Sequence, residues 1–276
     1  MNILFCSRVK FLATLDDNAD INKIIKSIKK LNKINKIFKL EKCEASNIED
    51  HNIYIFIKNN ILHLNFSHLF YDGYSIAFIF QKIDQIYKDE IKNYKFQLYD
   101  GNYSKLKLVK NSIKLIPGLD YKNVYYALFK EQNKKTIKIL KSKLNELSTK
   151  EVIYYLVDEL NIKNYCLILN ARKKYTEYEG VLGNLLYFSG ILNKNTNTNV
   201  KNHMDNKKND CSIEEVINSG SSPRTLQINS YLNFNLPSFV KYFSPPNFNI
   251  LNGNYILIHP VNNNEKYIIV DYYYFT

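Results

Sequence analysis

The sequence contains no tryptophan and only three arginines, Arg8, Arg172 and Arg224, among its 38 basic residues. Lysine, asparagine, isoleucine and tyrosine are abundant instead, a bias typical of codon usage in an AT-rich genome. The formal charge of +12 is therefore poor evidence for a nucleic-acid partner. An arginine that persists in such a sequence has two explanations, which are chance and a need for the planar, always charged guanidinium fork.

Clustered cysteines and long apolar runs are also lacking. Cys6, Cys43, Cys166 and Cys211 are scattered and form no CxxC pair, which indicates free thiols in a reducing compartment and no metal site. No apolar run has the length of a membrane span, and no charged region of a signal peptide precedes the first apolar residues. We therefore expect a cytoplasmic globular protein, and 276 residues suffice for one large domain or two small ones.

Hydrophobic periodicity predicts alternating β and α segments in the first ninety residues. We expect strands over 3–15, 38–44, 52–59 and 61–70, and a helix over 18–34 whose apolar residues recur every three or four positions. The last two strands are separated by Asn-Asn, so they are predicted to form a hairpin.

The rest of the chain is predicted to contain a second set of elements. We expect a turn-rich connection over 91–130, followed by two helices over 136–160 with Ser148 or Thr149 as a cap. A buried strand over 164–172, a polar surface loop over 193–210 and a closing hairpin over 254–275 complete the chain. His63, His203 and His259 are interpreted as packing or surface residues without a role.

The stretch NFSHLFYDGYS, residues 65–75, ends an apolar strand in a histidine. His68 continues the face of Leu64 and Phe66, where partial desolvation favours the neutral imidazole and hence a proton acceptor. The strand pattern breaks at Gly73, which permits a tight or left-handed turn. A helical repeat follows at once, with Asp72 or Ser75 as its cap.

The order His68, three residues, Asp72 and Gly73, between a strand and a helix, resembles the HxxxDG motif of the chloramphenicol acetyltransferase-like superfamily. This superfamily includes the condensation domains of nonribosomal peptide synthetases and the BAHD acyltransferases. The fold that the resemblance implies is α/β (α+β), a compact two-lobed sandwich of mixed sheets and helices. The N-terminal lobe would span 1–100 and the C-terminal lobe 101–276.

A second segment supports the resemblance. Residues 167–190 are similar to the region of the family in which a buried strand ends in Asn-x-Arg and a Gly-Asn pair follows, here Gly183-Asn184. The resemblance implies a salt bridge from Arg172 to Asp72 across the two lobes. Asp72, Gly73 and Arg172 would then support the site, while Asn184 and Ser230 would contact the substrate or the oxyanion.

The chemistry that the resemblance implies is direct acyl transfer. His68 would act as the general base for a hydroxyl or amine acceptor, and the donor would be a thioester of coenzyme A or of a carrier protein's phosphopantetheine arm. No tightly bound cofactor and no metal are expected. The expected partners are a small-molecule acceptor and an acidic acyl or peptidyl carrier protein, without nucleic acid, in a monomer or loose dimer.

Departures from the family pattern keep other interpretations open. Ser67 stands where condensation domains have a first histidine, no DFGWG motif is present, and the block before His68 is short. The main alternative is a non-catalytic scaffold or carrier-protein docking module. The others are a different class of enzyme, with Cys6 or Ser67 as a nucleophile activated by His68, and a basic, tyrosine-rich nucleic-acid binder.

Overall fold

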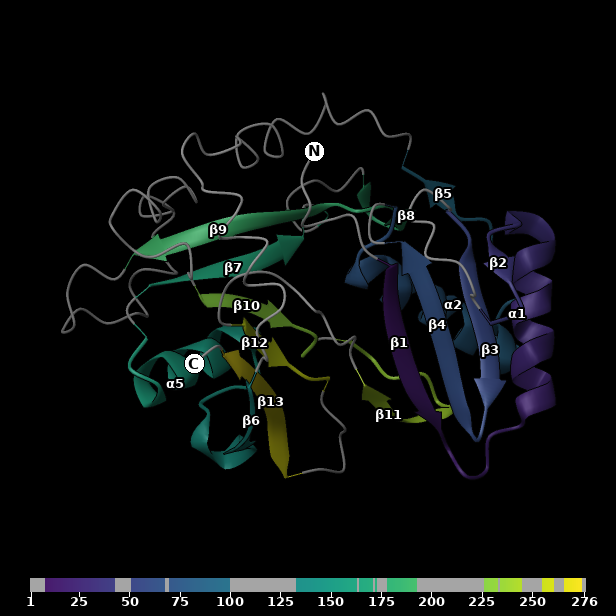
Figure 1. The fold of residues 1–276 in the computed structure, drawn as a ribbon. Helices are drawn as coiled ribbons and strands as arrows, with labels where there is room; N and C mark the ends of the chain where they lie inside the picture. Colours follow the sequence, from purple (N-terminus) through teal and green to yellow (C-terminus); the bar gives the residue numbers. More distant parts are fainter. Residues whose placement is uncertain are drawn as a thin grey trace. The chain divides into compact units, whose positions relative to one another are not determined.

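The computed structural model divides the chain into two compact units (Figure 1). The structure describes residues 8–42, 51–67, 70–99, 133–162, 164–170, 172, 178–192, 226–232, 234–244, 255–260 and 266–274. Unit 1 comprises Met1–Gly101, Asn170–Leu185 and Asn235–Phe248, and unit 2 comprises Asn102–Leu169, Leu186–Phe234 and Asn249–Thr276. The first segment of unit 1 ends at Gly101, and the expected division into lobes at 1–100 and 101–276 stays a prediction. Two later segments, however, return to unit 1, because they pair and pack with its elements.

Unit 1 is built on a mixed five-stranded sheet in the order β11-β1-β4-β3-β2. Its strands are β1 (Arg8–Leu15), β2 (Phe38–Lys39), β3 (Ile53–Lys58), β4 (Ile61–Ser67) and β11 (Val240–Ser244). The predicted β3–β4 hairpin is confirmed, with Asn59 and Asn60 both at positive φ in its turn. A short parallel pair of β5 (Gln97–Leu98) and β8 (Val181–Leu182) also belongs to this unit.

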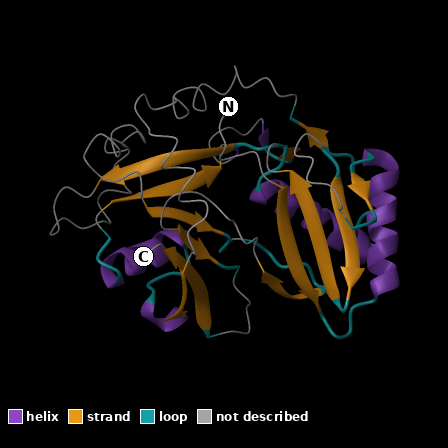
Figure 2. Ribbon diagram, in the orientation of Figure 1, coloured by secondary structure: helices purple, strands orange, loops and turns teal. Residues whose placement is uncertain are grey.

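Unit 1 also contains two helices, α1 (Ile21–Asn35) and α2 (Gly73–Tyr87) (Figure 2). The α1 prediction is confirmed, since Ile24, Ile28 and Leu31 are buried at the expected spacing. In α2 the Phe80 ring lies 6.0 Å from the Phe243 ring of β11, so this helix packs against the sheet. The start of α2 is therefore fixed by the core of unit 1.

Unit 2 contains a mixed six-stranded sheet in the order β6-β13-β12-β10-β7-β9. The strands, in chain order, are β6 (Asn133–Leu140), β7 (Asn164–Asn170), β9 (Leu186–Leu192), β10 (Leu226–Ser230), β12 (Tyr255–Ile258) and β13 (Tyr267–Tyr274). Helix α5 (Thr149–Glu159) buries Val152, Ile153 and Leu156 in the same core as Ile256 and Ile268 of the sheet. The closing hairpin is confirmed as the antiparallel pair β12–β13.

The prediction of two helices over 136–160 was half wrong. Asn133–Leu140 is strand β6, followed by a short 3-10 helix at Lys141–Lys143, and only α5 is an α-helix. Ile137 and Ile139 alternate with exposed Lys138, and Ile139 is fully buried, which is the period of a strand. Ser148 caps α5 as expected, accepting a bond from the Glu151 N–H at 3.2 Å.

Other differences are smaller. The strand expected over 38–44 is only two residues long within the described part. The predicted loop at 193–210 lies outside the described residues, as does most of the connection at 91–130. No helix in the described part of the chain has the length and apolar character of a membrane span.

Candidate functional site

Strand β4 ends at Ser67 and helix α2 begins at Gly73, so five residues connect them. The Ser67 carbonyl accepts bonds from the N–H groups of Phe70 and Tyr71, each at 3.2 Å, and thus the chain turns as soon as the strand ends. His68 follows Ser67 but lies outside the described residues, so its position stays a prediction.

Gly73 does not adopt the left-handed conformation, which was one of the two kinds of turn that a glycine would permit there. It is the first residue of α2, and the single described glycine with positive φ is Gly180. Asp72 has the extended backbone angles of an N-cap residue, φ −107° and ψ 176°, so the helix starts without special glycine geometry.

Asp72 is the N-cap of α2 and is fully buried. Its Oδ1 accepts bonds from the Ser75 N–H and the Ser75 hydroxyl, both at 2.8 Å. Its Oδ2 accepts bonds from Arg172 Nη1 at 2.6 Å and from the Leu185 N–H at 3.0 Å. Four donors thus compensate a carboxylate that has no access to water.

Arg172 provides the cation of the expected ion pair, with its side chain only 2% exposed. Its Nε donates to the Val181 carbonyl at 2.9 Å, and its Nη2 donates to the Gly183 carbonyl at 3.0 Å. The guanidinium carbon also lies 4.6 Å from the centre of the Tyr74 ring. Lysine has neither the planar fork nor enough donor directions for these contacts.

The pair joins residues 100 positions apart in the sequence, but both belong to unit 1. The salt bridge that the resemblance implied is present, and its two residues fall in the same contact-based unit. The physical reason is that Asn170–Leu185 packs with the first hundred residues. The ion pair therefore holds the entry of α2 within its own unit.

Ser75 lies at the centre of this network and was considered in the sequence only as a cap. Its buried hydroxyl oxygen lies 3.0 Å from the Gly183 N–H, 3.1 Å from Arg172 Nη2, 2.8 Å from Asp72 Oδ1 and 2.9 Å from the Gly183 carbonyl. A hydroxyl has one proton to donate. Because Arg172 already donates to that carbonyl, we assign the Ser75 proton to Asp72.

The Gly183-Asn184 pair is placed beside this network. A Cβ on Gly183 would lie 2.6 Å from Tyr99 Cβ, so no side chain fits there. Asn184 is half-buried next to it. The glycine is thus explained by close packing, while a substrate contact for Asn184 stays a prediction.

Ser230, in contrast, lies in unit 2 as the last residue of β10. Its oxygen is 3.0 Å from the Thr149 hydroxyl and accepts a bond from the Leu232 N–H at 3.3 Å. These bonds fix the end of β10 to the start of α5. A role for Ser230 toward the oxyanion stays a prediction.

Sequence reasoning missed a second polar cluster, which surrounds Asp271 of β13 in unit 2. Its Oδ2 lies 2.7 Å from His259 Nε2 and 2.8 Å from Lys134 Nζ, and its Oδ1 accepts a bond from Thr136 at 2.7 Å. Burial raises the pKa of Asp271, but the bonds from His259, Lys134 and Thr136 outweigh it and hold that pKa well below its usual range. His259 is thus part of a polar network, contrary to the packing role expected from the sequence.

No protein-family model and no curated protein sequence matches this chain. Solved structures do match it, at low identity. The first condensation domain of the CDA synthetase is 8% identical, with a TM-score of 0.58, covering 97% of this chain and 85% of that one. Vinorine synthase is 12% identical, with a TM-score of 0.56, covering 98% and 86%. The chain has the chloramphenicol acetyltransferase-like fold.

The fold that HxxxDG and Asn-x-Arg led us to expect is thereby confirmed. The X-domain from teicoplanin biosynthesis is also similar, with 8% identity, a TM-score of 0.50 and coverage of 97% and 84%. Within the described residues, no group of three or more His, Cys, Asp or Glu side chains is arranged to hold a metal ion.

Proposed function

We propose that this protein is an acyltransferase that moves an acyl group from a thioester to a hydroxyl or amine, with His68 as the general base. The observation that carries the proposal is the buried network of Asp72, Arg172 and Ser75. It anchors the first turn of α2 four residues after His68, on a fold shared with vinorine synthase and a condensation domain. So many bonds around one short connection suit a loop that must present a side chain in a fixed place.

The proposed reaction is a direct transfer. His68 takes the proton of the acceptor as its oxygen or nitrogen attacks the thioester carbonyl. The carbon–sulfur bond then breaks, and the thiolate leaves and takes up the proton. A positioned base of this kind contributes about 10²–10⁴-fold to the rate. A backbone N–H near Gly73, Asn184 and Ser230 are proposed contacts for the oxyanion or the substrate.

The donor is proposed to be acyl-CoA or an acylated phosphopantetheine on a carrier protein. The positive charge of the chain suits a phosphate-bearing donor or an acidic carrier. One alternative loses support from the structure, since Ser67 is fully buried and so is not an accessible nucleophile.

A non-catalytic scaffold is the second candidate function. Ser67 replaces the first histidine of the condensation motif, which favours loss of chemistry on a retained fold. Such a scaffold would keep its partner after His68→Ala and would release no thiol in either form.

The test is thiol release from a panel of acyl-CoAs with pooled amines and alcohols. We expect release that requires an acceptor and falls by about 10²–10⁴-fold in His68→Ala. His63→Ala is the matched control, because His63 lies in β4, which ends just before His68 in the sequence, and its ring stacks on Phe56 with the centroids 4.4 Å apart. Acylated carrier proteins are tested next if no CoA thioester reacts. Absence of release with both donor classes would reject the acyltransferase in favour of the scaffold.

A further inference from the structure

The positive charge of the chain is concentrated in one short segment. Residues 21–42, which contain α1 and β2, include eight lysines and a single acidic residue, Glu41. This segment therefore carries +7 of the chain's net charge of +12, in 22 of 276 residues. A compositional bias toward lysine acts along the whole sequence and does not explain such a local excess.

The lysines of α1 form one exposed face. Lys26, Lys29, Lys30 and Lys33, which we call the α1 lysine face, recur at helical spacing on the side away from buried Ile24, Ile28 and Leu31. Like charges three or four residues apart destabilise a helix. The arrangement is therefore unfavourable for the isolated chain, and an anion bound across the face would relieve it.

This charge is only partly compensated within the described part of the molecule, where the bond from Lys23, helped by the charges of Lys30 and Lys26, lowers the pKa of Asp89. Lys23 pairs with Asp89 at 2.9 Å, and Asp20 accepts the Lys23 N–H as the cap of the helix. None of the four lysines of the α1 lysine face forms an ion pair with a described carboxylate. The nearby acidic groups are thus already engaged.

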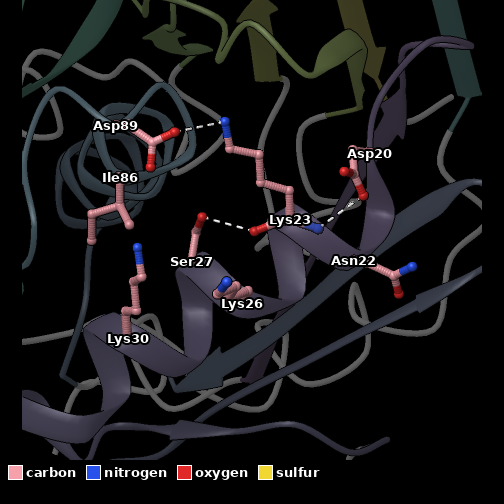
Figure 3. A pocket seen from close by; sticks show the side chains of 8 residues that line it. All are labelled: Asp20, Asn22, Lys23, Lys26, Ser27, Lys30, Ile86 and Asp89. Carbon is pink, nitrogen blue, oxygen red and sulfur yellow. Dashed lines mark hydrogen bonds and ion pairs between the residues drawn. The ribbon is translucent and has the colours of Figure 1, made fainter.

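A hollow of about 410 Å³ adjoins the face, between α1 and the end of α2. Figure 3 shows Lys26 and Lys30 along the helix that borders it, with Lys23 reaching across to Asp89. The lining consists of Asp20, Asn22, Lys23, Lys26, Ser27, Lys30, Ile86 and Asp89. The lining of the hollow therefore combines basic, acidic, neutral polar and apolar side chains.

These features distinguish among anionic partners. The apolar side of α1 is buried in unit 1, so the helix has no face to insert into a membrane. Among the described residues no aromatic side chain belongs to the lining, although the Tyr87 ring contacts Lys23 beside it, so the lining itself offers no stacking platform of the kind that single-stranded nucleic acids use. The carboxylates of Asp20 and Asp89 would also repel a dense row of phosphates. A protein surface can place separate carboxylates on the lysines and a neutral side chain against Ile86.

We propose that the α1 lysine face and its hollow dock an acidic segment of a protein partner. Carboxylates spaced along that segment meet Lys26, Lys29, Lys30 and Lys33, and attraction of this kind both steers the encounter and sets its dependence on salt. The proposal does not depend on acyl transfer, because docking is measured without turnover.

The test measures binding of a fluorescent helical peptide with glutamates at i, i+4 spacing to the full-length chain. The variant is Lys26→Glu/Lys29→Glu/Lys30→Glu. The control is Lys135→Glu/Lys138→Glu/Lys266→Glu, which changes three exposed lysines of unit 2 and gives the same net charge. We expect about tenfold or greater loss of affinity in the variant, since three surface charge contacts together reach that factor. The control should lose less than about threefold.

Circular dichroism checks that α1 still folds, and the new glutamates favour this by forming Glu–Lys pairs along the helix. Carbodiimide cross-linking followed by mass spectrometry should join the peptide to lysines of α1. Equal losses in variant and control would show attraction by net charge alone and overturn the proposal. Tighter α1-dependent binding of a single-stranded oligonucleotide or phosphatidylserine vesicles, compared at equal anion concentration, would overturn the assigned class of partner.

Discussion

The two units each bury an aspartate, and they do so in different ways. Asp72 in unit 1 is fully buried and is paired with a guanidinium whose side chain is 2% exposed. Asp271 in unit 2 is 3% exposed, but one of its cations, Lys134, has a side chain that is 48% exposed. The first carboxylate is thus neutralised inside the protein, and the second is partly neutralised at the surface.

The origin of the partners differs as well. Donors to Asp72 come from the first turn of α2 and from two points of Asn170–Leu185, so the network ties distant parts of the sequence together. Donors to Asp271 come from β6 and the end of β12, which flank its own strand in the sheet. The first network builds tertiary structure around the HxxxDG segment, whereas the second adds bonds to strands that already pair.

The two clusters also differ in how completely they are satisfied. Because an ionised carboxylate only accepts, His259 must carry a proton on Nε2 to bond Asp271. Its Nδ1 is buried and has no hydrogen-bond partner among the described residues. The Asp271 cluster is therefore looser, and we expect smaller effects when it is changed.

The largest effect is expected from Arg172→Ala. This change leaves Asp72 charged and buried without a cation, which costs about 3–5 kcal/mol of unfolding free energy. Since the chain lacks tryptophan, urea unfolding is followed by circular dichroism, and hydrogen exchange of peptides from β4 and α2 locates the loss.

Two further variants make this test specific. Arg172→Lys keeps the charge but not the bonds to Val181 and Gly183, so it should recover only part of the stability. Asp72→Ala/Arg172→Leu leaves no lone charge and should be less damaging than the two single losses added together. A loss below about 1 kcal/mol in Arg172→Ala would mean that the network does not hold the start of α2.

An intermediate effect is expected from acid acting on unit 2. The pKa of Asp271 is lowered in the folded state, so its stabilising contribution is complete above its ordinary value of 3.8 and is lost as the pH falls below it. Asp271→Asn should remove this part of the pH dependence. Hydrogen exchange of β12 and β13 peptides between pH 5 and pH 2.5 measures it, with β3 peptides of unit 1 as the internal control. Identical pH profiles for Asp271→Asn and the unmodified chain would contradict the prediction.

The sequence predicted those features that depend on neighbours along the chain. The α1 helix, the Asn59-Asn60 hairpin and the Ser148 cap follow from local periodicity and turn chemistry. The ion pair of Asp72 and Arg172 was predicted from a motif together with the scarcity of arginine. The central position of Ser75 was not, because its contacts with Gly183 depend on packing 108 residues away.

The Asp271 cluster was missed for a different reason. His259 and Asp271 lie on opposite strands of a hairpin that the sequence did predict, but their contact depends on the register, in which Leu257 faces Asp271. Lys134 and Thr136 belong to β6, which was interpreted as helix, so the third strand of the cluster was absent from the expectation. If the alternation of Ile137 and Ile139 with polar residues had been interpreted as the period of a strand, β6 would have been predicted.

The smallest effect is expected from Lys134→Gln. Partial burial lowers the pKa of Lys134, and its bond to Asp271 more than reverses this. Because the ammonium is about half exposed, water and salt screen the pair, and its loss should change the unfolding free energy by about 1 kcal/mol or less near pH 7. Thermal unfolding at low salt, compared with exposed Lys135→Gln on the same strand, measures the difference, which should shrink in 1 M salt. A loss as large as that of Arg172→Ala would show that unit 2 depends on its buried carboxylate as strongly as unit 1 does.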